Sequence, residues 1–442
     1  MNNSIFQSWN FKKLEDVAEV VDSLHKTPFY VDSGYPMVRV TDIKGGFLKL
    51  AECKRVTEEV FQEFTKKYLP CKGDILFSRV GTYGMSSYVI TEEEFCLGQN
   101  TVVIKPKINS RYLYLCLNSP SVKQQIEGFA VGSTQKTISL KSIKSLEIPV
   151  SEKQEIETIA HILGTLDDKI ELNQQTNQTL EAIARALFKS WFIDFDPVRA
   201  KMDGRQPAGM AAETAALFPD DFKDGGAIGK IPKGWKVKKL VEITSKIGSG
   251  ATPRGGSQVY VDEGVSLIRS QNVYDYQFSW DGLARITEET AEQLRNVTVE
   301  PNDILLNITG DSILRTCIVE PSVLPARVNQ HVSIIRAVPE IPCRYLHLYL
   351  VQPQIKNLLL GFDTGGTRKA VTKGQLESVS VPVPSESVLL RFREITNPLY
   401  ECINSNLAES RTLASIRDAL LPKLLSGEIR IQDAEKAVEA VL

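Results

Sequence analysis

Two stretches of the chain carry apolar residues at alternating spacings of three and four. The first stripe runs from Ile156 to Trp191, and a second with the same spacing runs from Leu389 to Leu424. Such a stripe lies along one side of a helix and is typical of a coiled-coil seam. At 1.5 Å per residue, a helix of about 40 residues is roughly 60 Å long. The pattern predicts two long helices, in residues 151–192 and 385–427, that pair as an antiparallel coiled coil.

Both stripes contain polar residues near their midpoint. Asn173 and Asn177 occupy seam positions in the first stripe, and Asn406 and Ser410 occupy the same positions in the second. A polar seam residue lowers stability but selects one alignment of the helices. Antiparallel pairing would bring the two polar centres together; the alternative is that the helices rotate and leave them in solvent. Pro422 is expected to disturb the last turns of the second helix.

The segments before each stripe have a mixed pattern. Short β-branched and aromatic runs, such as residues 75–77, 101–104 and 145–150, are bounded by Gly, Asn, Asp and Pro and predict strands. Residues 111–129 have the apolar spacing of one helix. The pattern therefore predicts α+β lobes with a curved, partly antiparallel sheet.

The segment that contains one lobe and one long helix occurs twice in the sequence. Residues 9–192 recur in diverged form at 235–425; for example, residues 73–76 match 302–305, residues 98–102 match 328–332, and residues 132–136 match 365–369. A repeat much longer than the roughly 20–50 residues of solenoid units is a domain with an appendage. We expect a pseudo-twofold internal repeat with the following segments: a lobe in 1–150, a long helix in 151–192, a linker loop in 193–230, a lobe in 231–384, a long helix in 385–427 and a tail in 428–442.

Composition limits the cellular compartment, the metal sites and the partners that can be expected. No apolar run is long enough to span a bilayer and the first residues lack a signal-peptide profile, so we expect a cytoplasmic protein without membrane partners. The seven cysteines form no C-x-x-C pair and the four histidines are not at metal-ligand spacing, so neither a disulfide framework nor a metal site is expected. Residues 1–150 and 231–384 are slightly basic, which suits lobes that meet phosphates but also fits ordinary scatter of charge.

Catalytic motifs are missing. The best phosphate-loop candidate, residues 225–231, has the wrong glycine spacing and no Ser or Thr after its lysine. Residues 397–400 (Asn-Pro-Leu-Tyr) resemble a base-flipping methyltransferase loop, but they lack its second proline and lie within the second stripe. Neither a serine-hydrolase elbow nor a zinc-protease helix is present. A non-catalytic binding protein is the favoured interpretation.

Polar residues that suit duplex DNA stand at matched places in both copies. Arg, Asn and Gln read base edges, while Ser, Thr, Lys and backbone amides hold phosphates. The candidates in the first copy are Arg39, Thr41, Arg79, Thr82, Tyr83, Gln99, Asn100, Ser133, Gln135 and Lys136. Those in the second are Arg269, Gln271, Asn272, Asn307, Asn329, Gln330, Thr367, Arg368 and Lys369. For each of them a role in a turn or cap is the alternative.

Three central segments resemble a known family. They are residues 166–173 (Leu-Asp-Asp-Lys-Ile-Glu-Leu-Asn), 187–192 (Leu-Phe-Lys-Ser-Trp-Phe) and 194–201 (Asp-Phe-Asp-Pro-Val-Arg-Ala-Lys). They are similar to the central conserved region of the specificity subunit of type I restriction-modification enzymes. The alternation of lobe, helix, lobe and helix resembles that family over nearly the whole chain, whereas the lobes match it in layout only.

The resemblance implies a non-catalytic DNA-recognition subunit with two target-recognition domains. Each would read one half of a bipartite target in double-stranded DNA, and the helices would set the spacer and dock two methylation subunits. Those partners would supply S-adenosylmethionine and adenine methylation, and motor and nuclease subunits would add ATP- and Mg-dependent cleavage, so this chain would bind no cofactor itself. The alternative is a coiled-coil scaffold whose lobes bind proteins without sequence-specific DNA binding.

Overall fold

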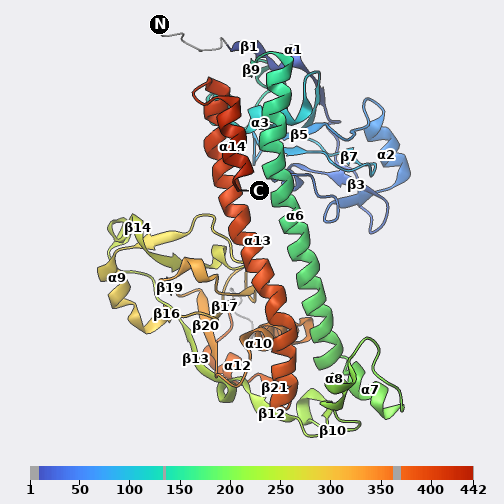
Figure 1. Ribbon diagram of the computed structural model, residues 1–442, viewed down its shortest axis with the longest axis vertical. Helices are drawn as coiled ribbons and strands as arrows, with labels where there is room; N and C mark the ends of the chain where they lie inside the picture. The colour runs from blue at the N-terminus through green and yellow to red at the C-terminus, as the bar shows by residue number, and fades with distance from the viewer. Residues whose placement is uncertain (1–8, 133–135, 362–369, 442) are drawn as a thin grey trace. The chain divides into compact units, whose positions relative to one another are not determined.

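The computed structural model describes residues 9–132, 136–361 and 370–441 (Figure 1). The chain divides into two compact units: unit 1 comprises residues 1–178 and 403–442, and unit 2 comprises residues 179–402. The division passes through both long helices, α6 (Lys153–Phe192) and α13 (Glu386–Ser426). Each unit therefore contains one lobe and one part of each long helix.

The lobe of unit 1 contains two small sheets and a two-stranded ribbon. The first sheet is antiparallel, in the order β2-β8-β5-β6, and the second has the order β4-β3-β7 with β3 parallel to β7. The ribbon pairs β1 with β9. The strands are β1 (Asn10–Lys13), β2 (Ala18–Asp22), β3 (Tyr35–Val38), β4 (Lys54–Val56), β5 (Ile75–Ser78), β6 (Ser86–Tyr88), β7 (Cys96–Leu97), β8 (Thr101–Pro106) and β9 (Glu147–Val150). The predicted strands at 75–77 and 101–104 are confirmed, and the strand predicted at 145–150 begins only at Glu147, because Ser145 caps the end of the preceding helix.

The helices of this lobe differ from the prediction in one place. Instead of one helix over 111–129, the structure has two, because Pro120 has no N–H and starts a new helix. The hydroxyl of Ser119 caps that helix by accepting a hydrogen bond from the Val122 amide at 3.4 Å. The helices are α1 (Leu14–Val17), α2 (Glu58–Thr65), α3 (Ser110–Asn118), α4 (Pro120–Phe129) and α5 (Leu140–Lys144).

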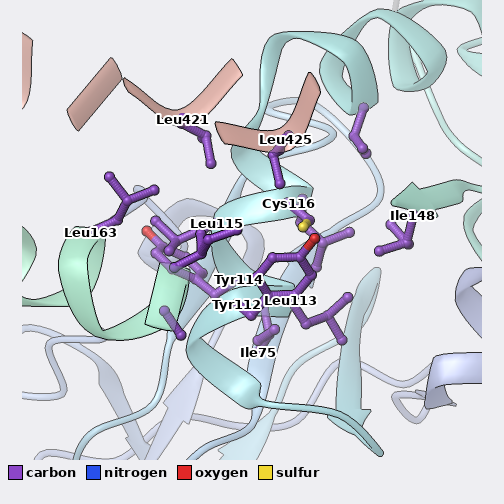
Figure 2. Close-up of a cluster of buried hydrophobic side chains, with 14 of the residues drawn as sticks. Ile75, Tyr112, Leu113, Tyr114, Leu115, Cys116, Ile148, Leu163, Leu421 and Leu425 are labelled. Carbon is purple, nitrogen blue, oxygen red and sulfur yellow. The ribbon is translucent and has the colours of Figure 1, made fainter. Parts of the chain in front are cut away.

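Helix α3 joins the sheet to the long helices. Figure 2 shows its residues 112–116 between Ile75 and Ile148 of the strands and the leucines of α6 and α13. Leu163 of α6 and Leu421 and Leu425 of α13 complete this cluster of buried side chains. The lobe and the helices of unit 1 therefore share one hydrophobic core, so the lobe is fixed to the helices that follow it.

Unit 2 repeats this plan with one more strand, β16, in its second sheet. Its sheets have the orders β13-β20-β17-β18 and β15-β14-β19-β16, and β12 pairs with β21 as β1 pairs with β9. The strands are β12 (Lys236–Lys239), β13 (Thr244–Ser249), β14 (Tyr260–Ile268), β15 (Ala284–Ile286), β16 (Thr298–Val299), β17 (Ile304–Asn307), β18 (Thr316–Ile318), β19 (Ala326–Val328), β20 (Val332–Ala337) and β21 (Ser380–Val383). The helices are α9 (Glu288–Gln293), α10 (Cys343–Leu350), α11 (Pro353–Gly361) and α12 (Lys373–Glu377).

Strand register corrects one part of the predicted repeat. Phe77 pairs with Val102 on β8, and Leu306 pairs with Ser333 on β20, so Val102 corresponds to Ser333. The match of residues 98–102 with 328–332 is therefore wrong by one position, and Gln99 corresponds to Gln330. The sequence misled because Asn and Gln occur next to each other in both copies, whereas the hydrogen-bonded ladder fixes only one alignment.

The two long helices run antiparallel within unit 1. Asp167 pairs with Arg417 at 2.6 Å, and Lys169 pairs with Glu409 at 3.5 Å. Residue numbers therefore decrease along α13 in the direction in which they increase along α6. Leu163 and Leu413 are buried in their shared core. The two long helices and their antiparallel pairing are confirmed, while a coiled coil with regular interlocking side chains stays a prediction.

The polar centre of the seam is buried. Asn173 and Asn177 are 4% and 7% exposed, which excludes the alternative that they face solvent. The amide of Asn406 donates to Asn177 Oδ1 at 2.8 Å, and the amide of Asn173 donates to Glu409 Oε2 at 2.7 Å. The expected meeting of the two polar centres is confirmed.

The end of the second helix departs from expectation. The predicted disturbance at Pro422 is wrong, because α13 continues to Ser426. Pro422 lies on the exposed side of the last turns, while Leu421, Leu424 and Leu425 are buried in the core of unit 1 and hold those turns in place. The predicted tail contains helix α14 (Ile431–Glu439), whose Ala434 and Val438 enter the same core.

The segment between α6 and the second lobe is ordered. It contains α7 (Asp196–Met202), α8 (Ala212–Ala216), β10 (Phe222–Asp224) and, at its end, β11 (Lys230–Pro232). Phe218 packs against Trp191 of α6 with ring centroids 5.0 Å apart. No helix among the described residues combines the length and the apolar character that crossing a membrane requires.

Candidate nucleic-acid interface

Backbone hydrogen bonds gather the same loops in each lobe. In unit 1, Gly98 donates to Val38 at 2.8 Å and Arg79 donates to Asn100 at 2.9 Å. In unit 2, Asn329 donates to Ile268 at 3.0 Å and Ile308 donates to His331 at 3.0 Å. The loops that carry Arg39, Arg79 and Gln99 are thus held together in the first lobe. The loops that carry Arg269, Asn307 and Gln330 are held together in the second.

A further loop joins each cluster. Isolated bridges pair Val80 with Thr137 in unit 1 and Thr309 with Ala370 in unit 2. The bridges place Thr137 and Ala370, the residues that directly follow the segments predicted at 132–136 and 365–369, at equivalent positions of the two lobes. Of these segments, Ser133, Gln135, Thr367, Arg368 and Lys369 lie outside the described residues.

Arg39 and Arg269 occupy equivalent positions with different electrostatics. Each begins a short turn, in which the side chain three residues later accepts a hydrogen bond from the arginine amide: Asp42 at 2.9 Å and Asn272 at 3.0 Å. Asp42 also takes the Arg39 guanidinium in a fork of two 3.0 Å hydrogen bonds, which raises the pKa of Arg39. Arg269 instead donates to the carbonyl of Gly282 at 2.6 Å. Because Asn272 is neutral, it does not supply Arg269 with the countercharge that Asp42 supplies to Arg39.

Arg79 is largely occupied within the lobe. Its guanidinium forms an ion pair with Asp22 of β2 at 2.8 Å, and 18% of its side chain is exposed. The equivalent position in the second lobe is Ile308. Arg79 therefore orients the loop after β5 in unit 1 by a charge that unit 2 lacks at the equivalent position.

The ammonium group of Lys136 also has partners within the lobe. Lys136 Nζ lies 3.4 Å from Glu127 Oε2 and 3.3 Å from the hydroxyl of Tyr83, which itself donates to Glu127 at 2.7 Å. The hydrogen bond from Tyr83 lowers the pKa of the Glu127 carboxyl. Lys136 is exposed, but its nearest carboxylate competes with any phosphate. Thr41, Thr82 and Gln99 of the first cluster are exposed.

Several predicted amides have the turn role that the sequence left open. Asn272 and Asn307 are fully buried. Asn307 Nδ2 donates to the carbonyls of Ser270 and Val273 and to the Ser312 hydroxyl, at 2.9, 3.3 and 3.1 Å. Asn272 Nδ2 donates to the carbonyls of Ser279 and Asp281 at 3.0 and 3.2 Å. Both side chains hold the loops in shape and are out of reach of a ligand in this structure.

Two further amides also shape loops. Asn329 Oδ1 accepts a hydrogen bond from the His331 amide at 3.1 Å, and Asn100 has a left-handed backbone at φ 64°. An Asn residue tolerates that conformation better than most residues. Gln271 and Gln330 are exposed, so they are the amides of the second cluster that face solvent.

A hollow of about 400 Å³, lined by residues that include Ser270, Gln271 and Thr309, marks the second cluster. Its lining includes residues that the sequence did not single out: Tyr274, Asp311, Arg315 and His331. The guanidinium of Arg315 lies 4.7 Å from the centre of the Tyr274 ring. Arg315 and Tyr274 are distant in sequence and follow no motif, so only the fold brings them together.

His331 has a defined hydrogen-bonding state. The Gln330 amide donates to His331 Nε2 at 3.0 Å, so His331 Nδ1 carries the proton and donates to the Thr309 hydroxyl at 2.6 Å. Gln330 is thus oriented by His331, which lines the hollow. Among the described residues, no cluster of three His, Cys, Asp or Glu side chains is placed to hold a metal ion.

Comparison with known proteins agrees with this layout. The family model of the type I restriction modification DNA specificity domain matches residues 7–182 and again residues 232–388, more than half of the chain. The HindI specificity subunit of Haemophilus influenzae is 29% identical over 407 residues, covering 81% of this chain and 87% of that protein. The MjaIX specificity subunit of Methanocaldococcus jannaschii is 24% identical over 438 residues, covering 97% of this chain and 95% of that protein.

A solved structure shares the fold. The crystal structure of the type I restriction-modification S subunit from M. genitalium aligns with a TM-score of 0.55 at 19% identity, over 96% of this chain and 97% of that one. The two matched segments contain the two lobes described above and part of each long helix. The chain therefore belongs to the type I restriction-modification DNA specificity family: it is a DNA sequence-recognition subunit, and the catalytic activities of such systems belong to other subunits.

Proposed function

We propose that each lobe reads one half of a bipartite target in double-stranded DNA. The observation that carries this proposal is the pair of loop clusters, which occupy the same place in both lobes but differ in some of their side chains. Arg39 corresponds to Arg269 and Gln99 to Gln330, whereas Arg79 corresponds to Ile308. A common frame with a variable surface is what two readers of different half-targets need, because sequence is read by side chains at base edges.

The long helices set the spacer between the half-targets and dock two methylation subunits. Continuous helices of 40 and 41 residues support this role, because each is roughly 60 Å long and same-side faces of a duplex recur about every 34 Å. The hydrogen bond between the half-buried Asn406 and the buried Asn177 supports one fixed alignment of the helices. S-adenosylmethionine, ATP and Mg²⁺ belong to the partner subunits, and this chain binds DNA and those subunits without a cofactor of its own.

Exchange of one lobe tests the proposal. Residues 1–150 are replaced by the corresponding lobe of the H. influenzae relative, and the chimera is expressed with a methylation subunit. Sequencing of adenine methylation in the host genome should show a new first half-target and an unchanged second half-target and spacer. A change in both halves, or in neither, contradicts the assignment of one half-target to each lobe.

A further inference from the structure

One aromatic side chain of unit 1 is almost fully exposed to solvent. Phe29 is 94% exposed, in the loop of residues 23–34 between β2 and β3, and its neighbour Tyr30 is 41% exposed. A single exposed aromatic is ordinary on a protein surface. Here, however, the loop that carries it is built twice.

The second copy is the loop of residues 250–264, between β13 and the regular part of β14. Gly34 and Gly264 have φ +144° and +157°, and a Cβ atom at either would come within 2.2 Å of the Val56 carbonyl oxygen or 2.4 Å of the Ile286 carbonyl oxygen. Both positions therefore require glycine. The carbonyl of Gly34 accepts from Arg55 at 2.7 Å, and that of Gly264 accepts from Arg285 at 3.1 Å.

Sequence around these glycines is also kept. Tyr30-Val31-Asp32 precedes Gly34 as Tyr260-Val261-Asp262 precedes Gly264, and Thr27-Pro28 matches Thr252-Pro253. Tyr30 and Tyr260 have the same exposure, 41% each. The stems of the two loops are therefore equivalent.

Each stem is connected to the loop cluster of its own lobe. In unit 1, Asp22 at the start of the loop holds both His25, at 3.0 Å, and Arg79, at 2.8 Å. In unit 2, the Thr252 hydroxyl is hydrogen-bonded to Gln330, and the Gly250 amide donates to Asn329 at 3.1 Å. The loops are continuous with the surfaces that carry the proposed DNA contacts.

The tips of the loops differ in chemistry. After Thr-Pro, the first loop continues with Phe29 and the second with Arg254, which is exposed and followed by further residues before Tyr260. An apolar ring can contact a thymine methyl group or wedge into a base step, whereas an arginine is suited to phosphate. The two loops thus share the same base but carry different residues at the tip. This is the arrangement expected of two loops that contact different half-targets.

We propose that residues 23–34 and 250–264 form a second pair of DNA-contacting loops, in which Phe29 contacts bases of the first half-target and Arg254 contacts a phosphate beside the second. This inference rests on the proposed function, since it assigns additional contacts to the same two readers. Neither tip has a core role, so both can be changed without loss of the fold.

The test uses the full chain with methylation subunits added. The parent protein first selects its sequence from a random duplex library, and the selected duplex is the probe for binding at a series of salt concentrations. Phe29→Ala should weaken binding about ten-fold without changing the salt dependence, and repeated selection should relax the first half-target only. Arg254→Ala should reduce the slope of log K against log salt by about one and leave both selected half-targets unchanged.

Matched controls lie elsewhere on the same units. Phe11→Ala removes another exposed ring, 63% exposed, from β1, and Arg295→Ala removes an exposed guanidinium outside the cluster. Both should bind as the parent does, while Phe29→Tyr, which keeps the ring, should retain most of the affinity.

The results that overturn the inference are distinguishable from one another. If the parent selects a bipartite sequence but the two tip variants bind and select like the parent, the loops do not contact DNA while the proposed function stands. If the parent selects no sequence, both fail. Loss of methylation-subunit binding in Phe29→Ala, with DNA affinity unchanged, would also overturn the inference, because the tip would then serve a protein contact.

Discussion

At the scale of single residues, the two lobes have an arginine at the same backbone position but differ in the charge of the residue beside it. Arg39 and Arg269 have the same backbone cap, but Asp42 neutralises the first, whereas the neutral Asn272 cannot neutralise the second. A phosphate near Arg39 must compete with Asp42, since a carboxylate is already bound in a fork. The second lobe therefore presents a guanidinium that is more available to phosphate at this position than the first.

The contrast predicts the effect of one matched substitution. Asp42→Asn should make the first turn like the second: the backbone cap is kept and Arg39 is released for DNA. DNA affinity should rise, and the slope of log K against log salt should steepen by up to about one. Arg269→Ala should reduce the slope by about one, and Arg39→Ala by less. Equal effects of the two alanine variants in a salt titration would contradict this account.

His347 is a buried histidine outside the two loop clusters. It lies in α10, its Nε2 donates to the Thr316 carbonyl at 3.0 Å, and burial lowers its pKa from 6.5 to about 4. The unfolded chain therefore takes up a proton near pH 6.5, whereas the folded chain takes one up only near pH 4. A fall in pH across this window favours unfolding, by at most about 3 kcal/mol.

A variant without the imidazole tests this sign. In His347→Gln the titration is lost, so the free energy of unfolding of the parent relative to the variant should be constant above pH 7 and decrease between pH 6.5 and about 4. Urea unfolding followed by the fluorescence of Trp191 and Trp235, both buried in unit 2, measures it. A difference that does not change with pH would show that His347 is protonated equally in both states.

At the scale of elements, periodic patterns could be predicted from the sequence and tertiary choices could not. The heptad stripes predict α6 and α13 because a stripe of that length has one solution. The apolar spacing continues across Pro120, so the pattern does not reveal that a new helix begins there. At Pro422 the pattern predicts a disturbance that does not occur, because the leucines buried beside it outweigh one lost hydrogen bond.

The candidate site was predictable only in outline. Residue types and their repetition along the chain predict which loops carry candidate contacts, and among the described residues the loops of Arg39, Arg79 and Gln99, and those of Arg269, Asn307 and Gln330, lie together in their lobes. Exposure could not be predicted: Asn272 and Asn307 are buried in hydrogen bonds to carbonyls, while Arg315 and Tyr274 line the hollow without any sequence signal. Side-chain placement depends on contacts between distant segments, which a single sequence does not specify.

The polar residues at the centre of the two long helices can be replaced to test their role in helix alignment. Asn177→Leu alone should destabilise the chain by about 1 kcal/mol or more, because the amide of Asn406 loses the Asn177 acceptor in a partly buried seam. The double variant, with Asn406→Leu as well, should be as stable as the parent or more stable, while its choice of helix alignment weakens. Urea unfolding measures the first effect, and methylation mapping of spacer length measures the second. A double variant that is less stable than both single variants, with an unchanged spacer preference, would contradict the register role.

At the scale of the whole molecule, the repeat provides matched junctions. Each lobe is closed by a ribbon that joins its first and last strands, β1 with β9 and β12 with β21, and each ribbon leads into a long helix. Asn10 pairs with Val150 as Lys236 pairs with Val383. Because the two ribbons have the same register, a lobe can be exchanged at these strands without changing the path of the chain into the helix.

This equivalence suggests a chimera in which a copy of the first lobe replaces the second lobe. If residues 236–383 are replaced by a second copy of residues 10–150, both readers carry the same loops, and the pseudo-twofold repeat expected from the sequence becomes a repeat of identical lobes. The chimera, expressed with a methylation subunit, should methylate a palindromic target made of two first half-targets in opposite orientation. Methylation mapping checks this, and the parent provides the first half-target for comparison. A chimera that folds, as judged by cooperative unfolding, but keeps the parent's second half-target would show that recognition of that half does not belong to the second lobe.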